Sequence, residues 1–199
     1  NVADGSYSES SRWPVSVGVN VKGTSESGTI VTNTYPASGS SDASFFLYSS
    51  TLTDGNQSIS HMTIRGSSLT GRRAILVMHR SNVELHHLTI EDFLATGVHF
   101  RHQIDWMTPP TTYATGNSIH DCTITNCSDR NYDSYASGNL RIDGQQDMEI
   151  YNCYFENTER PTGHNGNTFN FTNCRGIDMH DCTFKTVSYT HLRAHETVL

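Results

Sequence analysis

The chain has 199 residues and a formal net charge of −7, and only 17% of its residues are charged. This length suits one domain with its own core, and the negative charge argues against binding to nucleic acid phosphates or to an anionic membrane. No apolar run approaches the roughly 20 residues that a membrane-spanning helix needs. The abundance of Ser, Thr, Asn and Gly favours short strands joined by turns.

A six-residue phrase recurs along the chain at intervals of 26 to 34 residues. Its copies are ISHMTI from Ile59, LHHLTI from Leu85, IHDCTI from Ile119, IYNCYF from Ile150 and MHDCTF from Met179. Each copy has apolar residues at places one, four and six. Places four to six alternate as a strand does, whereas places one to four do not, so the phrase predicts a two-residue corner between two short strands.

Another alternating strand precedes most copies of the phrase. These strands are AILVM from Ala74, GVHFR from Gly97, NLRID from Asn139 and TFNFT from Thr168. A unit of three short strands cannot bury its apolar side alone, but stacked units bury it together. The sequence therefore predicts an all-β chain that forms a single-stranded parallel β-helix of about five to six coils. The uneven intervals argue against a propeller or a leucine-rich horseshoe.

The fourth place of the phrase is predicted to form an inward stack, with coils about 4.8 Å apart. Its members are Met62, Leu88, Cys122, Cys153 and Cys182. Cysteine at this place acts as a small buried hydrophobe. A zinc site is disfavoured because alternation sends neighbouring His, Asp and Cys to different sides, and a disulfide is disfavoured because strand pairing already fixes the geometry. We expect no metal ligands here, and Cys127 and Cys174 receive no role.

The third place of the phrase is polar in every copy. Its members are His61, His87, Asp121, Asn152 and Asp181. Such side chains satisfy backbone groups at a bend and can hydrogen-bond to the same place one coil away. A catalytic role for the histidines is the alternative, and the polar corner ladder is the favoured interpretation.

Candidate site residues come from the outward positions of the preceding strands. With Val77, Phe100 and their equivalents inward, two outward rows follow: Phe46, Leu76, His99, Arg141, Asn170 and Tyr48, Met78, Arg101, Asp143, Thr172. The two middle coils concentrate His99, Arg101, Arg141 and Asp143, and His79 and His102 lie at the strand ends. Opposite charges on neighbouring exposed strands also form modest ion pairs without any function.

The segment GNLRIDGQQDMEIYNCYFENTERPTGHNGNTFNFTNC resembles the right-handed β-helix proteins of the pectate lyase-like superfamily. The stretches ADGSYSES and VGVNVKGTSESGTIV, within residues 1–55, are similar to the N-terminal coils or cap of such proteins. The resemblance covers residues 1–186 as one domain. It implies a right-handed helix and a groove for an extended glycan along the outward face, but no catalytic residue carries over, because the calcium-binding Asp and WIDH-type signatures are missing.

The outward residues suit an acidic polysaccharide. Arg101 and Arg141 would neutralise a uronate carboxylate, His99 would accept or donate a proton, and Asp143 would orient an arginine, which favours lyase-type β-elimination. Hydrolysis would need a second carboxylate, such as Glu159 from a loop. The alternative is a non-catalytic module, either a glycan-binding or adhesin-like β-helix or a viral tail-spike element.

Three loops would wall the groove. Residues 102–116 hold Trp106, residues 128–138 hold Asp129 and Asp133, whose oxygens suit Ca²⁺ without an EF-hand pattern, and residues 160–166 hold His164. The predicted substrate-binding residues are His79, His102, Tyr48, Trp106, Glu159, His164 and Asn170.

The last segment, residues 187–199, reads VSYTHLRAHETVL and resembles a translated sequencing adapter. The repeat register stops after Phe184. We therefore expect a non-native tail on a β-helix truncated at its C-terminal side, with a short capping helix as the alternative. The predicted location is secreted or at the cell surface, either bacterial extracellular or periplasmic.

Overall fold

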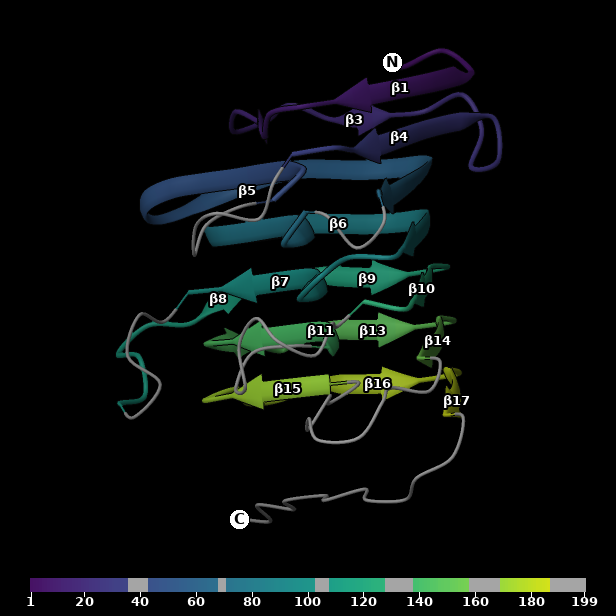
Figure 1. Ribbon diagram of the computed structural model, residues 1–199. Helices are drawn as coiled ribbons and strands as arrows, with labels where there is room; N and C mark the ends of the chain where they lie inside the picture. Colours follow the sequence, from purple (N-terminus) through teal and green to yellow (C-terminus); the bar gives the residue numbers. More distant parts are fainter. Residues whose placement is uncertain (36–42, 68–70, 103–107, 128–137, 158–168, 187–199) are drawn as a thin grey trace.

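The computed structural model describes residues 1–35, 43–67, 71–102, 108–127, 138–157 and 169–186. Within these ranges the chain forms strands and no helix, and it winds into a right-handed parallel β-helix of about five turns. Figure 1 shows the turns stacked in sequence order from β1 to β17. The predicted fold class is confirmed. The predicted tail at residues 187–199 lies outside the described residues.

Parallel pairing arranges the strands in three columns along the helix axis. The first column is β2 (Trp13–Pro14), β5 (Phe45–Gly66), β6 (Arg73–Glu91), β7 (Thr96–Arg101), β11 (Gly138–Asp143) and β15 (Phe169–Thr172). The second is β3 (Val21–Lys22), β5, β6, β9 (Ser118–His120), β13 (Glu149–Tyr151) and β16 (Asp178–His180).

The third column is also built by parallel pairing of strands from successive turns. Its strands are β1 (Gly5–Glu9), β4 (Thr29–Asn33), β5, β6, β10 (Thr123–Thr125), β14 (Tyr154–Asn157) and β17 (Thr183–Thr186). Strands β5 and β6 pass through all three columns, whereas the later coils divide into separate strands, as the repeat predicts. A short extra pair joins β8 (Ala114–Thr115) to β12 (Gln145–Gln146).

The core fills the inside of the solenoid with apolar rows in vertical register. In the first column Val77 lies opposite Phe100, Phe100 opposite Ile142, and Ile142 opposite Phe171. The first three side chains are buried, whereas Phe171 is 44% exposed. Each turn therefore buries its inward side chains against the turns on either side, and Phe171 lies in the last described turn.

Corners between columns use left-handed backbone. The φ angles of the third-place residues lie between 52° and 56°, as the predicted corner requires. These residues are His61, His87, Asp121, Asn152 and Asp181. Short polar side chains tolerate this conformation better than branched apolar ones, because they bond to the local backbone. Asn152 Nδ2 also donates to Asp121 Oδ1 one turn away, which is the kind of contact between coils that the corner ladder predicts.

The cysteine stack is confirmed as an inward row. The Sγ atoms of Cys122, Cys153 and Cys182 lie 3.7, 3.8 and 3.7 Å from the carbonyl oxygens of the first-place residues one turn earlier. These cysteines are free thiols, so the repeated position provides packing rather than cross-links. Cys127 is buried at another corner, and Cys174 Sγ donates to Ile142 O at 3.3 Å.

Candidate functional site

The two outward rows predicted from the sequence are present in the first column. The first row is Phe46, Leu76, His99, Arg141 and Asn170, each opposite the next. The second row is Tyr48, Met78, Arg101, Asp143 and Thr172. Register thus brings the side chains of β7 beside those of β11, although they are about 40 residues apart in sequence.

Asp143 contacts two of the other three predicted catalytic residues. His99 Nε2 lies 2.9 Å from Asp143 Oδ2, and Arg141 Nε donates to the same oxygen at 2.9 Å. Because the carboxylate accepts, His99 carries its proton on Nε2, and its buried Nδ1 has no hydrogen-bond partner among the described residues. Arg101, the fourth residue, lies opposite Asp143 in the register.

The prediction that these residues lie exposed on the outer face is wrong for His99 and Asp143. The side chains of His99 and Asp143 are only 2% and 5% exposed, whereas that of Arg141 is 20% exposed. Alternation along a strand sets the direction of a side chain but not what covers it. The cluster is therefore a buried His–Asp pair with an arginine at its outer side.

Burial decides the protonation of the pair. It lowers the pKa of His99 to about 3, which the hydrogen bond with Asp143 only partly offsets, and the charge of Arg73 lowers it further. Burial acts to raise the pKa of Asp143, but the hydrogen bond from His99 and the charge of Arg141 outweigh it, so that pKa lies below its usual value. At neutral pH a neutral imidazole therefore donates to an ionised carboxylate.

Two guanidinium groups lie on neighbouring coils around this carboxylate. Burial lowers the pKa of Arg101, and the positive charge of Arg141 adds to the effect. A guanidinium group carries a positive charge at neutral pH. Together with ionised Asp143 they leave a net positive charge at this place, which attracts an anion.

A histidine pair lies beside the second row on neighbouring coils, with His79 in β6 and His102 directly after β7. His79 Nδ1 and His102 Nδ1 are 3.2 Å apart, and the ring of Tyr48 lies 6.5 Å from that of His79. Burial lowers the pKa of both histidines. Tyr48 is 47% exposed. Three predicted substrate-binding residues, Tyr48, His79 and His102, therefore lie close together beside the second row.

One of the other predicted substrate-binding residues, Asn170, lies in the described part of the chain. Asn170 is half-buried, and its Oδ1 accepts a hydrogen bond from Thr172 at 3.1 Å. Trp106, Glu159 and His164 lie outside the described residues, as do the predicted calcium ligands Asp129 and Asp133.

One open hollow of about 480 Å³ lies on the second column rather than over the arginines. Its lining is polar and consists of Asn20, Asn56, Gln57, Ser58, Asn82, Glu84, Gly116 and Ser118.

An aromatic ladder on the second column was not predicted. It consists of His86, His120, Tyr151 and His180, which occupy the second place of successive phrases. Neighbouring rings are 4.7 to 5.3 Å apart and within 8° of parallel, so each ring covers the faces of the next. The sequence could have predicted this ladder, because the second place of four copies of the phrase is a histidine or a tyrosine.

Histidines also gather where this ladder meets the corner ladder. One ligand atom each from His87, His120 and Asp121 lies within 4.8 Å of the others, a spacing that a metal ion could bridge after small side-chain movements. The sequence predicts no metal ligands here, but side chains of the types that bind metal ions do lie together at this place.

Comparisons with known proteins support the fold. Residues of this chain superpose on the Geobacillus virus E2 protein ORF18 with a TM-score of 0.64 and 15% identity, over 92% of this chain and 32% of that one. The Dettilon tailspike protein gp208 gives a TM-score of 0.58 and 9% identity, over 95% of this chain and 40% of that one. The chain thus spans about a third of the first protein's length and two fifths of the second's.

Sequence comparisons add no assignment. No protein family matches the chain, and no curated protein matches it. At these low identities the two structural similarities establish the parallel β-helix architecture and nothing about activity. No helix in the described part of the chain is long and apolar enough to cross a membrane.

Proposed function

We propose that the protein binds an extended acidic polysaccharide along the outward face of its first column. The observation that carries the proposal is the arginine pair of β7 and β11. Arg141 is held by Asp143, and Asp143 is held in turn by buried His99, so the guanidinium is fixed before any ligand arrives. A fixed guanidinium loses little side-chain entropy when it binds a carboxylate.

Aromatic side chains extend this face toward the N-terminus. Phe46 and Tyr48 stack with their ring centroids 5.4 Å apart, and the guanidinium of Arg12 lies 4.8 Å above Phe46. Exposed aromatic rings suit the apolar faces of sugars, and arginines suit their carboxylates. A chain of uronic acids offers both kinds of surface at a regular repeat.

The two structural relatives support this proposal at the level of architecture. One is named a tailspike protein and the other is a viral protein, and both share the parallel β-helix. A glycan-binding, adhesin-like module with a secreted or surface-exposed location fits that setting. The activity of the whole protein is part of the same proposal, because this chain spans only part of either relative.

Lyase-type β-elimination is the second candidate, and the His99–Asp143–Arg141 cluster favours it. Arg101 and Arg141 would neutralise the uronate carboxylate, and His99, as the base, would take the adjacent C5 proton. The electron pair would form the C4–C5 double bond as the bond from C4 to the glycosidic oxygen breaks. Since His99 is 2% exposed, it does not reach a bound sugar in this geometry, and binding is the better-supported function.

Binding and cleavage can be separated in one experiment. The protein is mixed with polygalacturonate, alginate or chondroitin sulfate, and with dextran as a neutral control. Affinity is measured by calorimetry, and unsaturated products are followed near 235 nm. We expect at least one acidic glycan to bind and dextran not to bind. The proposal fails if no acidic glycan binds more tightly than dextran, and rising absorbance would establish elimination.

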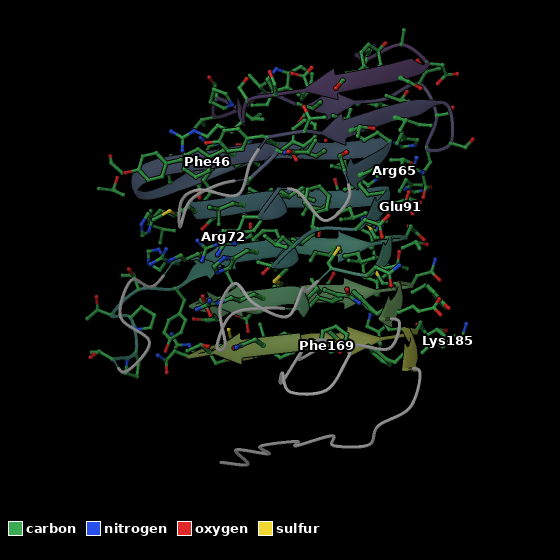
Figure 2. All side chains as sticks on the ribbon, in the orientation of Figure 1. Phe46, Arg65, Arg72, Glu91, Phe169 and Lys185 are labelled. Atoms are coloured by element: carbon green, nitrogen blue, oxygen red, sulfur yellow. The ribbon has the colours of Figure 1, made fainter. Side chains whose placement is uncertain are left out.

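A matched pair of arginine variants locates the site. Arg101→Gln should weaken binding about 10-fold, the effect of losing one charge-assisted contact. Arg65→Gln is the control, because Arg65 pairs with Glu91 at the opposite end of the coils from Phe46 (Figure 2). Equal affinities in the two variants would place the binding site elsewhere. A thermal melt of each variant checks that it is folded.

A further inference from the structure

The place where the aromatic ladder meets the corner ladder brings histidines from successive coils together. The second and third places of the phrase are occupied by His86 and His87 in one coil and by His120 and Asp121 in the next. The left-handed backbone at His87 and Asp121 turns these side chains outward, while Cys122 in the fourth place points inward and is 3% exposed. The left-handed corner therefore keeps the histidines and the aspartate together on the outside and leaves the cysteine on the inside.

The donor atoms of this cluster already face one another. His86 Nδ1 lies 2.9 Å from His87 Nδ1, and His120 Nδ1 lies 2.7 Å from Asp121 Oδ2. The rings of His86 and His120 stack at 5.1 Å, which fixes the two pairs side by side. Ligand atoms around one transition-metal ion, with bonds of about 2.0–2.2 Å, stand roughly 3–4 Å apart, so small rotations suffice.

The carboxylate of Glu84 holds the ring of His120 from the side opposite to the cluster. Glu84 Oε1 lies 2.9 Å from His120 Nε2, on the side of the ring away from Asp121. A carboxylate that accepts from one ring nitrogen orients the ring for metal binding through the other, an arrangement that recurs around protein metal sites. Here that other nitrogen is Nδ1, and a metal ion would replace its hydrogen bond with Asp121 Oδ2. His61, one coil earlier, stacks on His87 at 4.7 Å and adds a fourth imidazole beside the cluster.

We propose that His87, His120 and Asp121, with His86 beside them, bind one divalent transition-metal ion of the Zn²⁺ or Ni²⁺ class. One ligand atom from each of the first three already lies within 4.8 Å of the others. Imidazole nitrogen selects these ions over Ca²⁺ and Mg²⁺, which prefer oxygen ligands in larger number. The ion would link two successive coils at their outer corner, and this inference does not depend on the proposed glycan site.

The last coil provides a matched control within the same chain. His180 Nδ1 lies 2.8 Å from Asp181 Oδ2, the same His–Asp pair as in the cluster. Its neighbours one coil earlier are Tyr151 and Asn152, which supply no imidazole. Among the described residues, His180 thus forms a His–Asp pair without the second histidine that the proposed site needs.

The test is calorimetric titration of metal-free protein, prepared without a histidine tag, with ZnCl₂ and with NiCl₂. We expect one ion per chain for Zn²⁺ and no detectable binding of CaCl₂ or MgCl₂ at the same concentrations. Two variants keep the fold: His87→Asn retains a residue that tolerates left-handed backbone, and His120→Tyr copies the ring that Tyr151 supplies in the next coil. Each should weaken Zn²⁺ binding at least 10-fold.

The control variant His180→Tyr should bind Zn²⁺ as the unchanged chain does. Thermal melts with and without Zn²⁺ give a second readout, because an ion that binds only the folded state raises the melting temperature. Absence of Zn²⁺ and Ni²⁺ binding would overturn the proposal. So would an affinity that falls equally in His180→Tyr and His87→Asn, since it would indicate scattered surface histidines rather than one site.

Discussion

At the scale of single residues, left-handed corners and one buried His–Asp hydrogen bond define the local geometry of the described coils. Asn152 and Asp121 combine a left-handed backbone with a hydrogen bond between coils. His99 and Asp143 place a neutral ring and a charged carboxylate almost out of contact with solvent. Each of these features depends on one side chain, so each can be tested by one substitution.

Asn152→Val should be more destabilising than Asn152→Gly. Both variants lose the hydrogen bond to Asp121, but only valine carries the cost of a branched side chain at a φ of 52°. The expected difference is about 1–2 kcal/mol in the free energy of unfolding, measured by urea denaturation. Equal stabilities would show that this corner is not left-handed in solution.

Stability should fall on acidification through His99. Its pKa is about 3 in the folded chain and about 6.5 when unfolded, so between these values the unfolded chain binds more protons. This contribution is fully present above pH 6.5 and decreases by up to about 1.4 kcal/mol per pH unit as the pH falls toward 3.

The variant His99→Gln isolates this effect, because glutamine can still donate to Asp143 and does not titrate. Urea denaturation between pH 7 and pH 4 should give a shallower pH dependence for the variant than for the unchanged chain. Parallel pH profiles would contradict the burial of a neutral His99.

At the scale of the strand and corner, the sequence repeat predicted register well and exposure poorly. Spacing placed His99 opposite Arg141 and Arg101 opposite Asp143, because equivalent residues in a solenoid stack by necessity. Whether an outward side chain is covered depends on neighbouring side chains and loops, which have no repeat. The sequence argument against a metal site at these histidines has a related weakness, since alternation describes strands and does not hold at a left-handed corner.

Thiol labelling tests the inward direction of the cysteine row. Cys122 and Cys153 are 3% exposed, whereas Cys182 in the last described coil is half-buried. Under native conditions iodoacetamide should modify Cys182 well before the other two, by at least 10-fold in rate, as read by mass spectrometry of peptides. Labelling in denaturant provides the reference rates. Similar native rates at Cys153 and Cys182 would contradict the row.

At the scale of the whole molecule, stability arises from nearest-neighbour stacking of coils. Figure 1 shows that each turn lies directly on the next, with β15, β16 and β17 in the last described turn. The same inward row therefore contains fully enclosed and partly open positions. A solenoid of this kind gains stability per added turn, and a side chain between two turns contributes more than one covered on a single side.

Phe100 and Phe171 give a like-for-like comparison, because both are phenylalanines in one inward row. Phe100 is fully buried, and Phe171 is 44% exposed. Phe100→Ala should cost about 3–5 kcal/mol in the free energy of unfolding, and Phe171→Ala about half as much or less. Equal costs would show that the last described turn is covered in solution.

The stacking register is the claim on which the arginine pair and the histidine cluster both depend, and NMR spectroscopy tests it most directly. In a uniformly ¹⁵N- and ¹³C-labelled chain, nuclear Overhauser contacts should join the backbone protons of Ile119 to those of Ile150, and Ile150 to Met179. The same spectra should join His99 to Arg141. Contacts that pair these strands antiparallel, or that shift the register by one residue, would contradict the account.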